Sequence, residues 1–313
     1  MLFKTKENEM YDILLDYHQL LLSKTYNQLA WENGIVNLYG WLHPNTYCKI
    51  LKCVIINDCY CFFGLCRNNK YRCVVTPIPM YKDYIDYNDF IAILDYAKSI
   101  GCVTNGVIYF TCSASLVEEI NKHKIVSWHK YYPEFIFDRK AVVEMSGRSW
   151  QNKRSMIHKF KREHPNAKVR LANVSDIYGI DTVYNVWSVR KRSKGYSLHS
   201  TKTLHKELEF IFSDFGKTVS SMYVCEENNA IIGYISFGLL CKDTIQTIRR
   251  SVIISPEYKG LCEYIYHEGL KMFNVESKYI NDGDGCDENS SLYFWKVHYN
   301  PVDMVKTGFV DLR

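Results

Sequence analysis

A lysine stands at helical spacing among apolar residues in the middle of the chain. In the segment 149–163, residues three or four apart would share one face of a helix. These residues are Trp150, Lys153, Ile157 and Phe160. A lysine on such a face needs an anion, or a route for its ammonium group to water. Lys153 is therefore a candidate ligand for a phosphate or carboxylate, with snorkelling at the edge of the stripe as the alternative, and Arg154 beside it is a second candidate.

Two consecutive arginines, Arg249 and Arg250, lie near the end of a β-branched run that predicts a strand. Alternate residues of a strand point to opposite faces, so at most one of the two points at a site. A guanidinium can grip a carboxylate or a phosphate through two parallel hydrogen bonds. We take both as candidate substrate ligands, with a solvated arginine at a strand edge as the alternative.

Positive charge is concentrated in two stretches. The formal net charge of the 313 residues is only +5, but residues 148–170 are rich in Lys and Arg and contain Glu163 as their single acid. Residues 189–206 are also basic and contain no acid. Such clusters attract RNA, anionic lipid head groups or a phosphorylated cofactor, and a solvated basic face is the alternative.

The composition excludes several classes of protein. With 47% hydrophobic residues, 7 Pro and 16 Gly, the chain is neither collagen-like nor disordered. It shows no apolar run of about 18 residues and no signal-peptide pattern at its start, so we expect a soluble, cytoplasmic protein. Its 12 Cys form no CxxC pair, which favours reduced, buried thiols. The acids Asp282, Asp284, Asp287 and Glu288 lack the spacing of a calcium loop, and we expect no metal.

The apolar patterns predict mixed α/β structure in both halves. In the first half we expect helices at 11–31, 86–101 and 115–124, a strand meander over 49–78 with a turn at Asn57-Asp58, and strands at 105–114 and 132–145. In the second we expect helices at 149–163, 174–192, 202–215, 256–273 and 290–294 and strands at 222–227, 230–240, 244–254, 277–281 and 304–310, with a hairpin turn at Asn228-Asn229.

The order of elements in the second half resembles an acetyltransferase-type (GNAT) domain. In acetyltransferases the strand-to-helix junction carries a basic or amide residue, then two small residues whose backbone N–H groups approach the pyrophosphate of coenzyme A. The corresponding residues here are Glu257, Gly260 and Cys262. Gly260 fits a phosphate ligand, whereas the acid and the thiol argue against ordinary binding of coenzyme A.

Four segments carry a closer resemblance: 37–41 (NLYGW), 134–160, 247–266, and YIND at 279–282 followed by KVHYNP at 296–301. With them the chain resembles the family typified by the C-terminal domain of phosphatidylglycerol lysyltransferase, which is related to the Fem-type ligases. Residues that match the basic turn and helix of this family are Ser146, Gly147, Arg148, Lys153 and Arg154. Residues that match its tail are Asn281, Lys296, Tyr299 and Pro301.

The resemblance implies two tandem GNAT-like domains, 1–145 and 146–313, with the active cleft in the second. It implies transfer of an amino acid from aminoacyl-tRNA to an amine or hydroxyl acceptor, with tRNA as partner and no further cofactor. Asn281, Lys296 and Tyr299 become candidate catalytic residues, while Lys153, Arg154, Arg249, Arg250 and Gly260 become candidate substrate ligands. Whether the acceptor is a small molecule, a peptide or a lipid head group stays open, as does the oligomeric state. The alternatives are an N-acyltransferase that uses acyl-coenzyme A and a non-catalytic RNA-binding or scaffold module.

Overall fold

The computed structural model describes residues 7–25, 28–29, 33–41, 48–66, 71–73, 77–100, 107–110, 114–123, 127–130, 132–196, 198, 201–273, 276–284, 290–305 and 308–311. Within these ranges the helices are α1 Glu7–Leu22, α2 Ile35–Trp41, α3 Tyr87–Ser99, α4 Ala114–His123, α5 Arg139–Glu144, α6 Gln151–Glu163, α7 Ile177–Arg192, α8 Thr201–Phe212, α9 Asp214–Val219, α10 Leu261–Met272 and α11 Ser291–Val297. None of these helices is long and apolar enough to cross a lipid bilayer.

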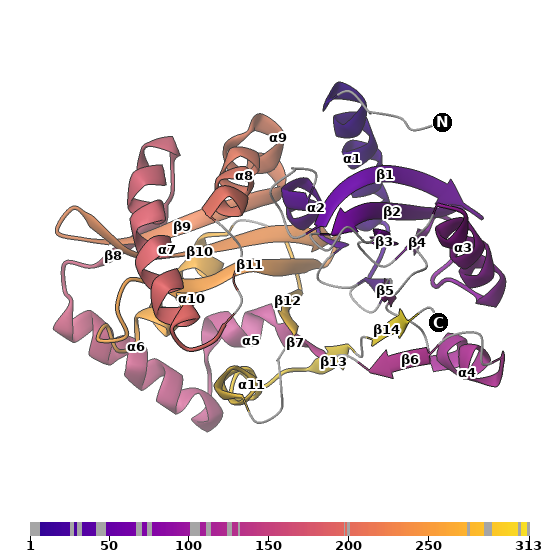
Figure 1. Cartoon of the computed structure of the whole chain (residues 1–313). Coiled ribbons are helices and arrows are strands. Elements are labelled where there is room, and N and C mark those ends of the chain that lie inside the picture. The colour runs from indigo at the N-terminus through magenta and orange to yellow at the C-terminus, as the bar shows by residue number, and fades with distance from the viewer. Residues whose placement is uncertain are drawn as a thin grey trace.

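The strands fall into three sheets (Figure 1). The largest has the order β13-β7-β12-β11-β10-β9-β8. Its members are β7 Glu134–Asp138, β8 Lys168–Leu171, β9 Ser220–Glu227, β10 Ala230–Cys241, β11 Thr244–Ile253, β12 Tyr279–Asp284 and β13 Asp303–Val305. The other sheets contain β1 Cys48–Ile56, β2 Cys59–Cys66, β3 Tyr71–Cys73 and β4 Ile78–Pro79, and β5 Val107–Phe110, β6 Ser127–Lys130 and β14 Gly308–Asp311. The mixed α/β class with mixed sheets is confirmed.

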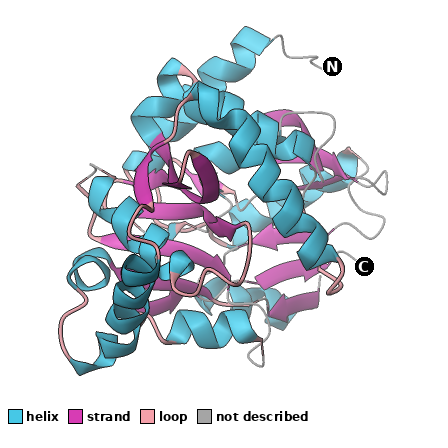
Figure 2. Ribbon diagram, turned by 90° about the vertical axis from the view of Figure 1, so that its left-hand side faces the viewer, coloured by secondary structure: helices cyan, strands magenta, loops and turns pink. Residues whose placement is uncertain are grey.

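Helices cover both faces of the seven-stranded sheet, as the two views in Figures 1 and 2 show. Buried side chains of α1, α2, α7 and α8 pack on one face, in a core that includes Tyr184 and Tyr234. Side chains of α5, α6 and α10 form a second core on the other face, around Phe160 and Phe237. The predicted stripe of α6 is confirmed, since Trp150, Ile157 and Phe160 are all buried there.

Turn and cap residues in the sequence predicted the ends of several elements correctly. Asn57 and Asp58 have positive φ in the turn that joins β1 to β2, and Asn228 and Asn229 have positive φ between β9 and β10. Such turns match the twist of the strands that they join, and Asn and Asp tolerate this conformation. Asp86 caps α3, where its side chain accepts hydrogen bonds from two backbone N–H groups.

The expectation of one strand over 132–145 is wrong in its second half. Strand β7 ends at Asp138, whose side chain accepts a hydrogen bond from the backbone N–H of Ala141 and so begins helix α5. The valines that suggested a strand lie in this helix, where Val142 packs into the core. Helix α10 also begins later than expected, at Leu261, because Gly260 turns the chain into it.

Strand pairing crosses the boundary that we expected at residue 145. Strand β7 precedes this residue but pairs with β12 and β13 in the seven-stranded sheet. Strand β14 follows it but pairs with β5 and β6, so the single strand expected at 304–310 is divided between two sheets. Figure 1 shows β14 beside β5 and β6, at the far end from α6 and α7.

Candidate functional site

The parallel strands β11 and β12 separate toward their C-terminal ends. They pair only through Thr244–Tyr279, Ile245–Ile280 and Gln246–Asn281. Beyond this point β11 continues to Ile253 and leads into α10, while β12 continues to Asp284. Ligands in open α/β sheets bind beyond the carboxyl ends of such strands, so the separation marks the candidate site.

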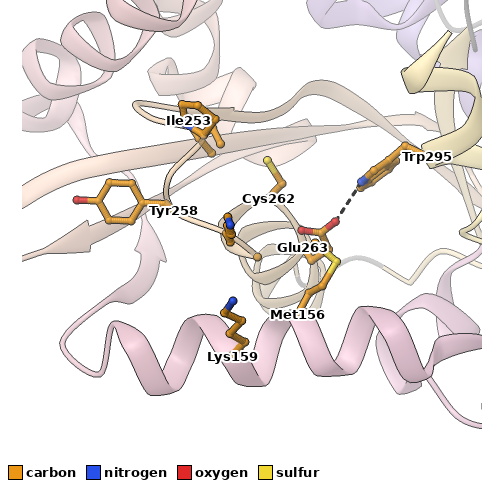
Figure 3. A pocket seen from close by; sticks show the side chains of 10 residues that line it. Met156, Lys159, Ile253, Tyr258, Cys262, Glu263 and Trp295 are labelled. Carbon is orange, nitrogen blue, oxygen red and sulfur yellow. Dashed lines mark hydrogen bonds between the residues drawn. The ribbon is translucent and has the colours of Figure 1, made fainter.

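A pocket of about 420 Å³ lies beside the end of β11, between α6, α10 and α11. Figure 3 shows the side chains that line it. They are Met156, Lys159, Ile253, Pro256, Tyr258, Lys259, Gly260, Cys262, Glu263 and Trp295. Its walls are largely apolar, with one buried acid and a few polar groups, which is the usual composition of a small-molecule site.

Gly260 brings helices α6 and α10 together. Its φ is +91°, a conformation that favours glycine. A β-carbon on this residue would stand 2.3 Å from the carbonyl oxygen of Met156, which belongs to α6. The absence of a side chain at this position therefore allows close packing of the α6 backbone against the start of α10.

Lys153 and Glu263 form a buried ion pair beside the pocket. The two residues are 6% and 3% exposed, and the Lys153 ammonium is 3.5 Å from Oε1 of Glu263. The same oxygen accepts a hydrogen bond of 3.1 Å from Nε1 of Trp295. The Lys153 ammonium also lies 4.5 Å from the ring centre of Trp295 and 4.4 Å from that of Tyr299. The anion expected beside Lys153 is thus the carboxylate of Glu263, a side chain of the protein itself.

A second polar cluster fixes the end of β12. The ammonium of Lys296 donates to the backbone oxygens of Asp282 and Gly283, at 2.5 and 3.1 Å, and lies 3.3 Å from Oδ2 of Asp282. Asn281 donates to Glu134 at 2.7 Å and accepts from the backbone N–H of Gly283 at 2.9 Å. All of these side chains are buried, so the cluster holds the strand end in one conformation.

The candidate residues therefore lie in distinct places. Lys153 contacts Tyr299, whereas Asn281 and Lys296 both bind the backbone of Gly283 at the end of β12. Arg154 donates to the backbone oxygens of Met145 and Gly147 and so holds the turn before α6. The side chain of Arg250 lies outside the described residues.

Arg249 points to the opposite face of the sheet from the pocket. It donates to both carboxylate oxygens of Glu207, at 2.8 and 2.7 Å, and lies against the ring of Tyr184. Burial lowers the pKa of Arg249, but the charge and hydrogen bonds of Glu207 raise this pKa by a larger amount. The guanidinium therefore stays charged. The structure does not bring Arg249 to the pocket.

The rim of the pocket carries hydrogen-bond donors. Lys159 and Lys259 are exposed there, and Lys159 is 3.8 Å from Glu163 of its own helix. Burial, together with the nearby charge of Glu227, raises the pKa of Tyr258, so its phenol stays protonated at neutral pH. The rim is thus suited to an anionic group, whereas the buried wall carries a carboxylate.

Sequence reasoning missed Glu263, Trp295, Asp282 and Glu134 as parts of these clusters. The signal for Glu263 was its place within LCEYIY, where an acid interrupts an apolar run. The signal for Trp295 was its place four residues before Tyr299, which follows the end of α11 at Val297. Among the described residues no group of three or more His, Cys, Asp or Glu side chains could hold a metal ion, and Asp287 and Glu288 lie outside them.

Comparison with known proteins gives the fold a context. The chain matches no protein-family profile. An uncharacterised protein of Mycoplasmoides gallisepticum is 20% identical over 196 residues, which are 61% of this chain and 60% of that protein. The match therefore spans about three fifths of this relative.

Solved structures are similar over nearly the whole chain. A protein of unknown function from Bacteroides thetaiotaomicron has a TM-score of 0.75 at 14% identity, with 96% of this chain and 97% of that chain covered. The C-terminal domain of a putative lysylphosphatidylglycerol synthetase from Agrobacterium fabrum has a TM-score of 0.61 at 11% identity, with 97% and 92% covered. FemX has a TM-score of 0.60 at 8% identity, with 95% of each chain covered.

A tandem GNAT protein from the clavulanic acid pathway also shares the architecture, with a TM-score of 0.54, 10% identity and coverage of 98% and 96%. The resemblance seen in the sequence is thus confirmed at the level of the fold. The chain shares its fold with the C-terminal domain of a putative lysylphosphatidylglycerol synthetase, with FemX and with a tandem GNAT protein.

Proposed function

We propose that the chain is an acyltransferase that passes the amino acid of an aminoacyl-tRNA to an amine or hydroxyl acceptor. The observation that carries the proposal is the pocket beside the separated strands β11 and β12, which combines a buried carboxylate, Glu263, with the rim cations Lys159 and Lys259. The fold shared with lysylphosphatidylglycerol synthetase and FemX supports it.

The junction before α10 argues for a donor other than acyl-coenzyme A. The close approach that Gly260 permits is taken by the backbone of Met156. Glu257 is exposed in the same loop, in place of the basic or amide residue of acetyltransferases. The packing at Gly260 opposes a pyrophosphate at this place, so we propose no cofactor besides the donor itself.

The exposed side of α6 supports tRNA as the donor. Lys161 and Arg162 are exposed on this helix, and Lys159 extends from it to the pocket rim. Phosphate contacts of this kind position an RNA without reading its sequence. They would leave the aminoacyl end of the acceptor stem at the mouth of the pocket.

The reaction needs orientation more than a strong nucleophile. The acceptor amine or hydroxyl attacks the ester carbonyl, the new C–N or C–O bond forms, and the bond to the tRNA ribose breaks. The proton of the acceptor ends on the ribose hydroxyl that leaves. Positioning supplies a large part of the rate in such a transfer. In this proposal Asn281 and Lys296 are positioning residues that fix the end of β12, and Tyr299 supports Lys153.

The experiment follows radiolabelled amino acids on charged tRNA, with and without a cell extract as source of the acceptor. Loss of label that requires both protein and extract supports the proposal. Tight, salt-sensitive binding of tRNA with no loss for any amino acid would identify an RNA-binding module instead. A rise in melting temperature with acetyl-coenzyme A would favour an acyl-coenzyme A donor.

A further inference from the structure

We infer that Glu263 binds the ammonium group of the donor amino acid, and that the pocket accepts amino acids with apolar side chains. The inference rests on the proposed function and names the substrate class of the same site.

The carboxylate of Glu263 has its protein partners on one side. Trp295 and Lys153 both approach Oε1. Figure 3 shows this oxygen turned toward Trp295 and the other oxygen turned toward the interior of the pocket. A carboxylate has lone pairs for several donors, so its second oxygen can accept a hydrogen bond from a ligand ammonium.

Burial makes this contact selective. Glu263 is 3% exposed, and in such surroundings a charge-assisted hydrogen bond is worth more than at the surface. Lys153 balances the negative charge of Glu263, because its ammonium is held 3.5 Å from Oε1. A neutral amide or hydroxyl in place of the ammonium would leave the facing oxygen with a weaker partner.

The other residues that line the pocket determine which amino-acid side chain it accepts. Met156, Ile253, Cys262 and Trp295 offer apolar surface, and the rim cations Lys159 and Lys259 would repel a second positive charge. A leucine-like side chain fits these walls, whereas a lysine side chain would bring its ammonium against the rim. The pocket volume of about 420 Å³ falls within the range of small-molecule sites.

The test uses amino-acid amides as probes, since they carry the free ammonium and the carbonyl of the donor without tRNA. Calorimetry should show that leucinamide binds the full chain at least roughly tenfold more tightly than N-acetyl-leucinamide, whose ammonium is blocked. It should also bind more tightly than lysinamide. Equal binding of leucinamide and its N-acetyl form, or no binding of leucinamide, overturns the ammonium site. Tighter binding of lysinamide overturns the apolar class.

Variants assign the contact to Glu263. Glu263→Gln should remove the preference for leucinamide over the N-acetyl form, while Glu257→Gln, an exposed acid nearby that does not line the pocket, should leave it unchanged. Because Glu263→Gln leaves Lys153 buried beside a neutral side chain, the double variant Lys153→Met with Glu263→Gln serves if the single one does not fold. Retention of the preference in the folded variant rejects the role of Glu263.

The transfer assay separates this inference from the proposed function. If leucinamide binds through Glu263 but no charged tRNA loses its label, the pocket binds ammonium compounds and the transferase proposal fails. The opposite result is also informative. The unaltered chain should prefer leucyl-tRNA to its 2-hydroxyacyl analogue, which lacks the ammonium group. If label is transferred and the Glu263→Gln variant keeps this preference in full, the transferase proposal stands and the inference fails.

Discussion

The ammonium of Lys153 lies 4.4 Å from the ring centre of Tyr299, so two residues from segments almost 150 positions apart share one buried site. The contact places a full positive charge over an aromatic face, an arrangement that is favourable when water is excluded. It also joins α6 to the end of α11, and with them the two sides of the pocket.

The pair of Lys153 and Glu263 should dominate the stability of this region. Lys153→Ala leaves the carboxylate buried without its cation, and we expect the free energy of unfolding to fall by about 3–5 kcal/mol. Lys153→Met combined with Glu263→Gln removes both charges and should recover most of the loss. Urea unfolding of the single and double variants measures the coupling. Independent, additive losses would show that the two side chains do not interact.

Gly260 should tolerate no side chain, for two separable reasons. Gly260→Ala meets both the cost of a positive φ and a contact of 2.3 Å with Met156. Gly195 provides the matched control, because its φ is +83° but nothing lies within 4 Å of a β-carbon built on it. We expect Gly195→Ala to cost about 1–2 kcal/mol, and Gly260→Ala distinctly more. Equal losses in thermal unfolding would refute the packing of α6 against α10.

Arg249 should contribute to the stability of the fold and not to substrate binding. Arg249→Lys keeps the charge but cannot reproduce the two parallel hydrogen bonds to Glu207. We expect a loss of about 1.5–3 kcal/mol in the free energy of unfolding, with the KM for the aminoacyl donor unchanged. A raised KM without a loss of stability would restore Arg249 as a substrate ligand.

The exposed cations of α6 should set the salt dependence of tRNA binding. Replacing Lys161 and Arg162 together by Ala should make the plot of log affinity against log salt concentration less steep. The change in slope should correspond to the loss of about two phosphate contacts. Lys140→Ala, in the exposed turn of α5, is the control and should leave the slope unchanged. An unaltered slope in the double variant would place the RNA on another surface.

Acid should weaken the protein through Glu268. Hydrogen bonds from His267 and then from Lys271 lower the pKa of this carboxyl from 4.5 to about 2. A carboxyl with a lowered folded pKa contributes stability that is complete above pH 4.5 and is lost as the pH falls toward 2. Glu268→Gln should therefore destabilise the protein at pH 6 and lose this effect near pH 2, in unfolding curves recorded across that range. An equal loss of stability at pH 6 and at pH 2 would contradict this role of Glu268.

Local chemistry in the sequence predicted the turns and caps but not the partners across the fold. The Asn-Asp and Asn-Asn turns and the Asp86 cap depend on residues that are neighbours in the chain. The strand predicted through Val142 and Val143 failed because the cap at Asp138 outweighed the β propensity of two valines. The spacing around Lys153 showed that it needs an anion, but spacing on one helix cannot show that Glu263 of another helix supplies it.

The pairing of β14 between β5 and β6 sets an order on the biosynthesis of this protein. Neither β5 nor β6 can complete its backbone hydrogen bonds until Gly308–Asp311 has left the ribosome. During synthesis, β5 and β6 therefore have edges that are not yet paired with β14. Unpaired strand edges are prone to pair with other chains. The three-stranded sheet β5-β14-β6 therefore cannot be completed before its last strand in the chain, β14, has been made.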